Sequence, residues 1–83
     1  MSEIKISMKL FGAFRKYGDS LELAIRPGSP ADIVKETLGN VLGDSARPLI
    51  RDSVLADEET ILPGDYIFDH DARLSILPPV CGG

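Results

Sequence analysis

The stretch Ile4-Lys5-Ile6-Ser7-Met8-Lys9-Leu10 alternates apolar and polar side chains without a break. Because successive side chains of a β-strand point to opposite faces, this period of two predicts a strand with one buried face. Phe11 comes next and interrupts the pattern, since it puts a large apolar side chain on the polar face. We therefore expect Phe11 to lie on the face of the sheet that no helix covers.

A second alternating segment follows the turn signal Gly18-Asp19-Ser20. Its apolar residues are Leu21, Leu23 and Ile25. Two alternating segments joined by a turn are typical of a β-hairpin, so the second strand is expected to pair with the first.

A helix is predicted after Pro27-Gly28, which ends the second strand. Ser29 is a favourable N-cap, and Pro30 suits the first helical position. Apolar or weakly polar residues then recur three and four apart, as one stripe: Ile33, Val34, Thr37, Leu38, Val41 and Leu42. Gly43 is a plausible end, which gives a helix of about 12 residues.

The second half of the chain reads as short strands and turns. In order, we expect a connection over 44–48, β character over 49–56 that is strongest at Val54-Leu55, a short return strand at 60–62, a brief apolar patch at 66–68 and a last strand over 73–77. With one helix on one face of a mixed sheet of four to five strands, this order predicts an α+β fold of the β-grasp type. The first and last strands would lie side by side in the middle.

The last six residues are Pro78-Pro79-Val80-Cys81-Gly82-Gly83. Glycine has no side chain, so Gly82-Gly83 can enter a narrow slot and present a carboxylate to another enzyme's reactive centre. The rigid proline pair behind it, and the apolar strand before that, favour an arm that projects from the sheet. The alternative is a frayed chain end. We expect residues 1–77 to form the domain and residues 78–83 the projecting tail.

Composition narrows the possible partners and compartments. With 83 residues the chain is expected to form one domain, and its net charge of −4 argues against nucleic acid and favours a partner with a basic docking face. No apolar run approaches the ~20 residues of a membrane span, so no membrane partner is expected. The N-terminus lacks the pattern of a secretory signal and the chain has one cysteine, which together favour the cytoplasm.

Essentially the whole chain resembles the ubiquitin-like sulfur carriers of the MoaD/ThiS type, and most closely the small subunit of molybdopterin synthase. Residues 9–18 are similar to the family's first strand and following turn, residues 74–83 to its closing Pro-Pro-Val-x-Gly-Gly pattern, and residues 62–67 to a segment of ubiquitin. Two departures stand out. His70-Asp71-Ala72 replaces the usual Gly-Asp turn, and Cys81 takes a position where a small inert residue is more usual.

The resemblance implies that the Gly83 carboxylate, carried on Gly82, is adenylated by a ubiquitin-activating-type adenylyltransferase that uses ATP and Mg²⁺. A persulfide sulfur donor then converts it to a thiocarboxylate, and an acceptor enzyme such as the molybdopterin synthase large subunit receives the sulfur. The chain has no Gly-rich phosphate loop and no metal-ligand cluster. We therefore expect it to bind no cofactor and to act as a small subunit or sulfur-donor co-substrate, not catalytic alone.

By the same resemblance, Phe11, Ile61 and Leu77 would contact the partner enzymes, together with the tail residues Pro78, Pro79, Val80 and Cys81. Alternation alone leaves a core role open for the first three. Other pathways (thiamine, cysteine or homocysteine, a thiolated metabolite), conjugation to lysines as a protein modifier, and a plain binding module also stay open. Within the tail, Cys81 is expected to tolerate replacement, and His70 to be a solvated turn residue.

Overall fold

The central sheet has the strand order β2-β1-β7-β4-β5. β1 (Ile4–Leu10) and β7 (Ala72–Leu77) run parallel in its middle, with β2 (Ser20–Ile25) antiparallel to β1. β4 (Val54–Ala56) is antiparallel to β7, and β5 (Ile61–Leu62) is antiparallel to β4. This computed structural model describes residues 2–79. The predictions on Val80, Cys81, Gly82 and Gly83 lie outside the described residues.

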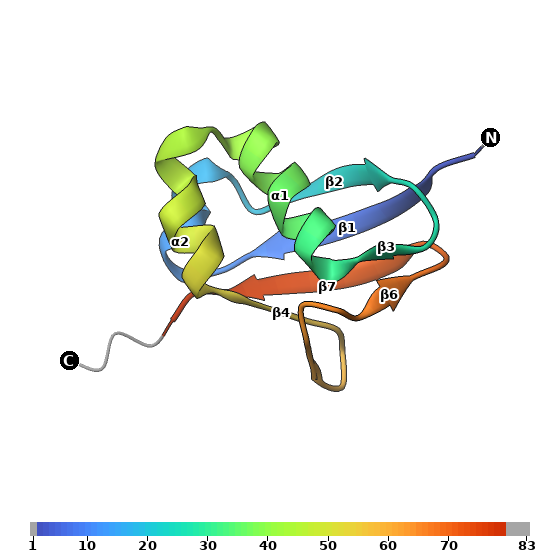
Figure 1. Cartoon of the computed structure of the whole chain (residues 1–83). Coiled ribbons are helices and arrows are strands. Elements are labelled where there is room, and N and C mark those ends of the chain that lie inside the picture. The colour runs from blue at the N-terminus through green and yellow to red at the C-terminus, as the bar shows by residue number, and fades with distance from the viewer. Residues whose placement is uncertain (1, 80–83) are drawn as a thin grey trace.

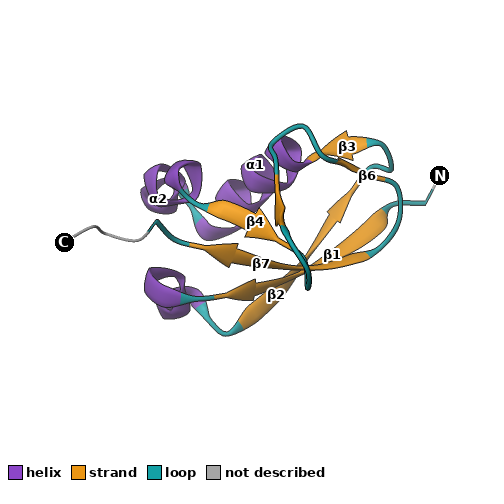
Figure 2. Cartoon of the chain, turned by 90° about the horizontal axis from the view of Figure 1, so that it is seen from below, coloured by secondary structure: helices purple, strands orange, loops and turns teal. Residues whose placement is uncertain are grey.

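One face of this sheet is covered by helix α1 (Ala31–Leu42) (Figure 1). The shorter helices η1 (Gly12–Tyr17), η2 (Asp44–Ala46) and α2 (Arg47–Asp52) lie toward the end of the sheet from which the tail leaves (Figures 1 and 2). β3 (Ser29–Pro30) and β6 (Ile67–Phe68) form a separate two-stranded ladder. A mixed sheet with one main helix on one face is a ubiquitin-like β-grasp, so the predicted fold class is confirmed.

The core lies between α1 and the sheet. The alternation predicted for β1 is confirmed, since Ile4, Ile6, Met8 and Leu10 are buried and the lysines between them are exposed. From β7, Leu74 and Ile76 face the same side. No helix of residues 2–79 has both the length and the apolar character that crossing a membrane requires.

The start of α1 differs from the prediction. Ser29 belongs to β3, and its Oγ donates to the carbonyl of Arg26 at 2.7 Å instead of capping the helix. The first helical N–H groups are satisfied by main-chain carbonyls: Ala31 N donates to Tyr66 O at 2.8 Å and Asp32 N to Gly64 O at 3.0 Å. A helix start needs acceptors for its free N–H groups, and here a segment distant in sequence supplies them. The helix ends at Leu42 before Gly43, as predicted.

The apolar stripe of α1 is narrower than predicted. Val34 and Leu38 are fully buried, but Ile33 and Val41 are 41% and 58% exposed. The expected β character of residues 49–53 is also wrong, because α2 occupies Arg47–Asp52 and the strand begins only at Val54. Lys35 of α1 stabilises the end of α2, because its Nζ donates to the carbonyls of Arg51 and Ser53 at 3.3 and 2.8 Å.

The turn before β7 has a structural role. Asp71 Oδ1 accepts the main-chain N–H of Lys5 at 2.8 Å. This bond ties the beginning of β7 to the beginning of β1, at the end of the sheet opposite the tail (Figure 1). His70 in the same turn is exposed.

Candidate functional site

The candidate site begins where β7 leaves the sheet at Leu77 (Figure 1). Pro78 packs against Gly12, so closely that a Cβ on this glycine would lie 2.7 Å from Pro78 Cγ. Gly12 also has φ +57°, a left-handed conformation that side chains disfavour. Both observations require a glycine at this position. The contact sets the course of the chain at the base of the tail.

Apolar side chains gather beside this point on the open face of the sheet, the face that α1 does not cover. We call this group the apolar cluster; its members are Phe11, Val54, Ala56, Ile61 and Leu77. Val54 is 39% exposed, Ile61 60% and Phe11 37%, while Leu77 is half-buried and Ala56 is buried. Large exposed apolar residues that adjoin one another mark an interaction site more often than isolated ones do.

The register of the strands shows that the cluster is continuous. Val54 is paired with Leu77, and Ala56 is paired with Ile61. Val54 and Ala56 are two residues apart on one strand, so they share a face. Phe11 follows Leu10, which faces the core, and has extended backbone angles, so its side chain points to the open face. Three sequence-predicted contact residues, Phe11, Ile61 and Leu77, therefore share the open face, with Val54 and Ala56 of β4 between Leu77 and Ile61.

Sequence reasoning missed Val54. Val54 and Leu55 are both apolar, and only the strand pairing shows which of them faces the core: Leu55 is paired with buried Ile76, whereas Val54 is paired with Leu77 on the open face. Of the predicted tail contacts, Pro78 is half-buried and Pro79 exposed, whereas 80–83 fall beyond the described part of the chain. That the cluster and tail bind a partner stays a prediction.

The turn between β4 and β5 borders the site and is held by a carboxylate. Asp57 Oδ1 accepts the main-chain N–H groups of Glu59 and Thr60, each at 2.8 Å. These two hydrogen bonds lower the pKa of Asp57 below its ordinary value of 3.8. Ile61 follows directly, so the turn fixes the most exposed member of the cluster. Residues 2–79 contain no group of three or more potential metal ligands.

Several solved structures share this fold at low sequence identity. SAMP1 from Haloferax volcanii superposes with a TM-score of 0.79 at 11% identity, over 95% of this chain and 99% of that one. A molybdopterin converting factor subunit 1 from Pyrococcus furiosus superposes with a TM-score of 0.77 at 17% sequence identity. The match covers 93% of this chain and 99% of that one. Ubiquitin of Caldiarchaeum subterraneum superposes with a TM-score of 0.67 at 16% sequence identity, over 99% of this chain and 100% of that one. No family model and no curated protein sequence matches the chain.

Proposed function

We propose that this chain is a ubiquitin-like sulfur carrier whose Gly83 carboxylate is activated by a partner enzyme and then carries sulfur as a thiocarboxylate. The observation that supports it most is the junction of β7 with the Pro-Pro-Val-Cys-Gly-Gly tail, with the apolar cluster beside it on the open face. The likeness to a molybdopterin converting factor subunit supports molybdopterin synthesis as the pathway.

The proposed chemistry needs a partner because a carboxylate is a poor electrophile. An oxygen of Gly83 attacks the α-phosphorus of ATP on the adenylyltransferase, so that pyrophosphate leaves and an acyl-adenylate forms. Persulfide sulfur then attacks the acyl carbon, and AMP leaves. A second thiol cleaves the resulting acyl disulfide, which yields the thiocarboxylate and a disulfide of the two thiols. On the acceptor enzyme the thiocarboxylate sulfur finally attacks an electrophilic carbon of the acceptor molecule and displaces its leaving group. Hydrolysis of the resulting thioester leaves the sulfur on that molecule as a thiol and restores the Gly83 carboxylate.

In this proposal the domain positions the tail. The apolar cluster would dock on the activating and acceptor enzymes, and the Gly12–Pro78 contact would direct residues 79–83 toward their active sites. Burying the exposed part of Ile61 and Phe11 would contribute about 1–2 kcal/mol each. In this proposal the apolar cluster would serve recognition, and the Gly83 carboxylate would serve the chemistry.

A mass measurement tests the proposal. The chain is incubated with its adenylyltransferase, ATP, Mg²⁺ and a persulfide donor, and the intact mass is followed. The expected result is a gain equal to sulfur minus oxygen, localised to Gly83. The variant without Gly82 and Gly83 should show no gain but the same thermal unfolding, because no core residue is removed. Absence of the gain with an enzyme that activates a control carrier would refute the proposal.

A second candidate is a protein modifier that joins Gly83 to lysines of other proteins, and the likeness to an archaeal ubiquitin favours it. It uses the same adenylate but ends in an isopeptide bond. Gly-Gly remnants on lysines of other proteins, lost with the truncated variant, would support the modifier.

A further inference from the structure

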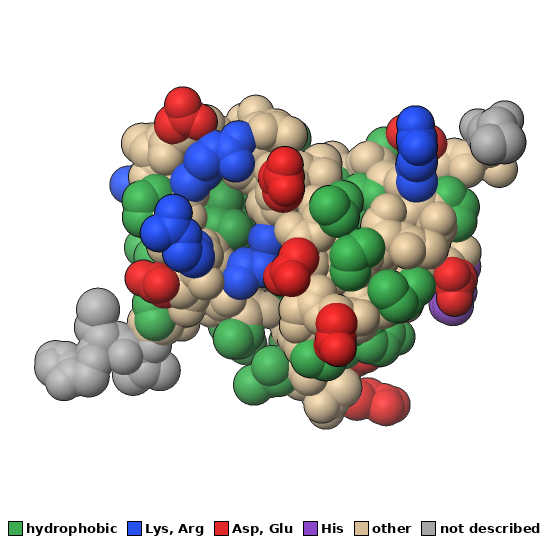
Figure 3. All heavy atoms as spheres, viewed as in Figure 1, with side chains coloured by type: hydrophobic (Ala, Val, Ile, Leu, Met, Phe, Trp, Pro, Cys, Tyr) green, Lys and Arg blue, Asp and Glu red, His purple; other side chains and the backbone are tan. Residues whose placement is uncertain are grey.

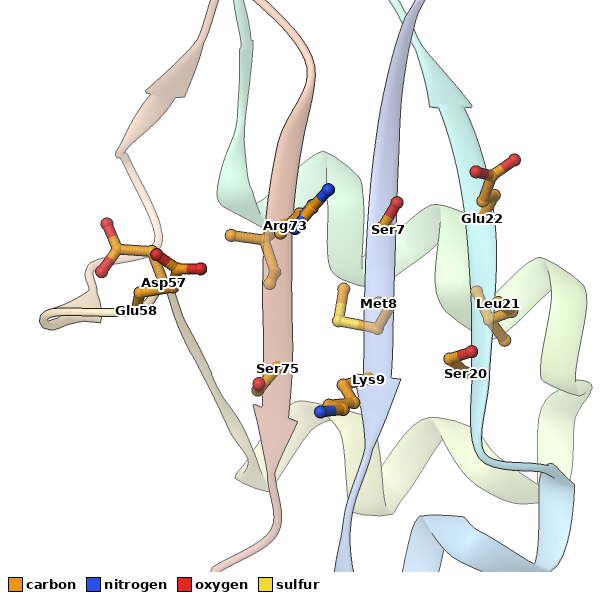
Figure 4. A pocket seen from close by; sticks show the side chains of 11 residues that line it. Ser7, Met8, Lys9, Ser20, Leu21, Glu22, Asp57, Glu58, Arg73 and Ser75 are labelled. Atoms are coloured by element: carbon orange, nitrogen blue, oxygen red, sulfur yellow. The ribbon is translucent and has the colours of Figure 1, made fainter.

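A groove of about 510 Å³ crosses the open face next to the apolar cluster. Figure 4 views this face with α1 behind the sheet. The floor is formed by outward side chains of β1 and β7: Ser7, Lys9, Arg73 and Ser75. Glu22 of β2 lies at one wall, and Asp57 and Glu58 of the β4–β5 turn lie at the other (Figure 4).

The strand register explains why this face is hollow. Ser7 is paired with Arg73, and Lys9 is paired with Ser75. Each long cationic side chain thus stands beside a short serine of the neighbouring strand. The charged ends of Lys9 and Arg73 both lie over the gap between β1 and β7 (Figure 4). The floor therefore presents two positive charges with serine hydroxyls between them.

These two cations have no partner among the described residues. The ion pairs within residues 2–79 join Arg15 to Asp19 and Arg47 to Asp44, and no hydrogen bond involves the side chain of Lys9 or Arg73. Two of the cations on the helical side, Arg47 and Lys35, differ in this respect. Lysines and arginines gather there over α1 and α2 (Figure 3), but Arg47 also binds Asn40, and Lys35 caps α2.

We propose that this groove docks a narrow acidic segment of the partner enzyme that handles the tail. Charge complementarity supports this, because carboxylates entering along the centre would meet Lys9 and Arg73. The walls carry three carboxylates, those of Glu22, Asp57 and Glu58, which would repel a broad acidic surface and limit the occupant to a narrow segment. The partner's identity, though not the groove, rests on the proposed function.

The groove is continuous with the apolar cluster, which supports a single partner that covers the groove and the cluster together. Ser75 of the floor is paired with Ala56 of the cluster, and Leu77 is two residues further along β7 on the same face. The chain's net charge of −4 favours a basic partner. The two cations of the floor favour an acidic segment along the centre line of the groove, and the three carboxylates of its walls confine the segment to that line.

A titration without the partner tests the groove itself. Amide chemical shifts of the chain are followed as hexaglutamate or hexalysine is added at low ionic strength. With hexaglutamate we expect saturable shifts at 7–9 and 73–75, weakened about tenfold in the Lys9→Glu/Arg73→Glu variant. Arg26→Glu, an exposed arginine after β2, is the matched control and should leave them unchanged. Shifts centred on α2, tighter hexalysine binding, or no saturable shifts would overturn the proposal.

A kinetic arm separates the groove from the proposed function. With the adenylyltransferase, the double reversal should raise KM for the chain about tenfold, with kcat unchanged and a weaker dependence on salt. Arg26→Glu should behave as the unchanged chain. If adenylation proceeds and KM does not move, the groove proposal is wrong and the carrier function stands. If no adenylation occurs, the carrier function fails, and the peptide titration alone decides on the groove.

Discussion

The two faces of the central sheet are built from the same strands but have opposite character. On the closed face, Ile6, Met8 and Ile76 are fully buried under α1. On the open face, the residues between them are small or charged, and the apolar ones cluster near the tail. The difference teaches that neighbouring residues of one strand have separate roles: one set stabilises the fold, and the other stays accessible on the surface.

The largest effect should come from the closed face. Ile6→Ala is expected to lower the free energy of unfolding by about 3 kcal/mol, because it opens a cavity beside a fully buried position. Lys5→Ala, one residue away on the open face, should change it by less than about 0.5 kcal/mol. Urea unfolding measures both. Equal losses of unfolding free energy in the two variants would contradict the claim that only the closed face stabilises the fold.

Gly12 tests the border between the faces. Gly12→Ala should cost about 1–3 kcal/mol, because φ +57° strains any side chain and the new Cβ meets Pro78. Adding Pro78→Ala removes the Cγ atom in the way, so the double variant should regain part of the loss. This double-mutant cycle is read by thermal unfolding. Simple additivity would show that Gly12 and Pro78 do not interact.

The apolar cluster should matter for docking and little for stability. Ile61→Ser, at a 60% exposed position, is expected to change the free energy of unfolding by less than about 0.5 kcal/mol. Its KM with the adenylyltransferase should rise about tenfold. Ile67→Ser is a matched control, since Ile67 is 48% exposed on β6. A similar rise in KM for both variants would argue against a defined cluster.

The smallest effect concerns the turn at Asp57. Its pKa is lowered in the folded state by the N–H groups of Glu59 and Thr60. The stabilisation is therefore complete above the unfolded pKa near 3.8 and is lost as pH falls through the lower folded value. Asp57→Asn should flatten the decline of the urea midpoint that begins as pH falls below about 4. Glu58→Gln, which removes the neighbouring charge, should leave the decline as it is.

The fold followed from the sequence where the pattern is local. Alternation in residues 4–10 and 21–25, and Gly43 at the helix end, identified elements that the structure contains. The errors arise from contacts distant in sequence. The carbonyls of Gly64 and Tyr66 replace Ser29 as the cap of α1, and Lys35 supports a helix where the residues from Leu49 suggested a strand.

The candidate site was predicted in part for the same reason. Phe11 was identifiable because it breaks an alternation, which is a local signal. Val54 was not, because its face depends on pairing with Leu77. The groove needed the register of two strands that are far apart in sequence, since only the pairing of Ser7 with Arg73 and of Lys9 with Ser75 brings both cations together.

The parallel pairing of β1 with β7 also has a mechanical consequence. The chain enters β1 at Ile4 and leaves β7 at Leu77, at opposite ends of the same ladder (Figure 1). Tension between these two points would shear all the hydrogen bonds of the ladder at once, whereas a hairpin can be peeled open one bond at a time. A force applied at Leu77 while Ile4 is held would therefore act along the direction in which this ladder resists best.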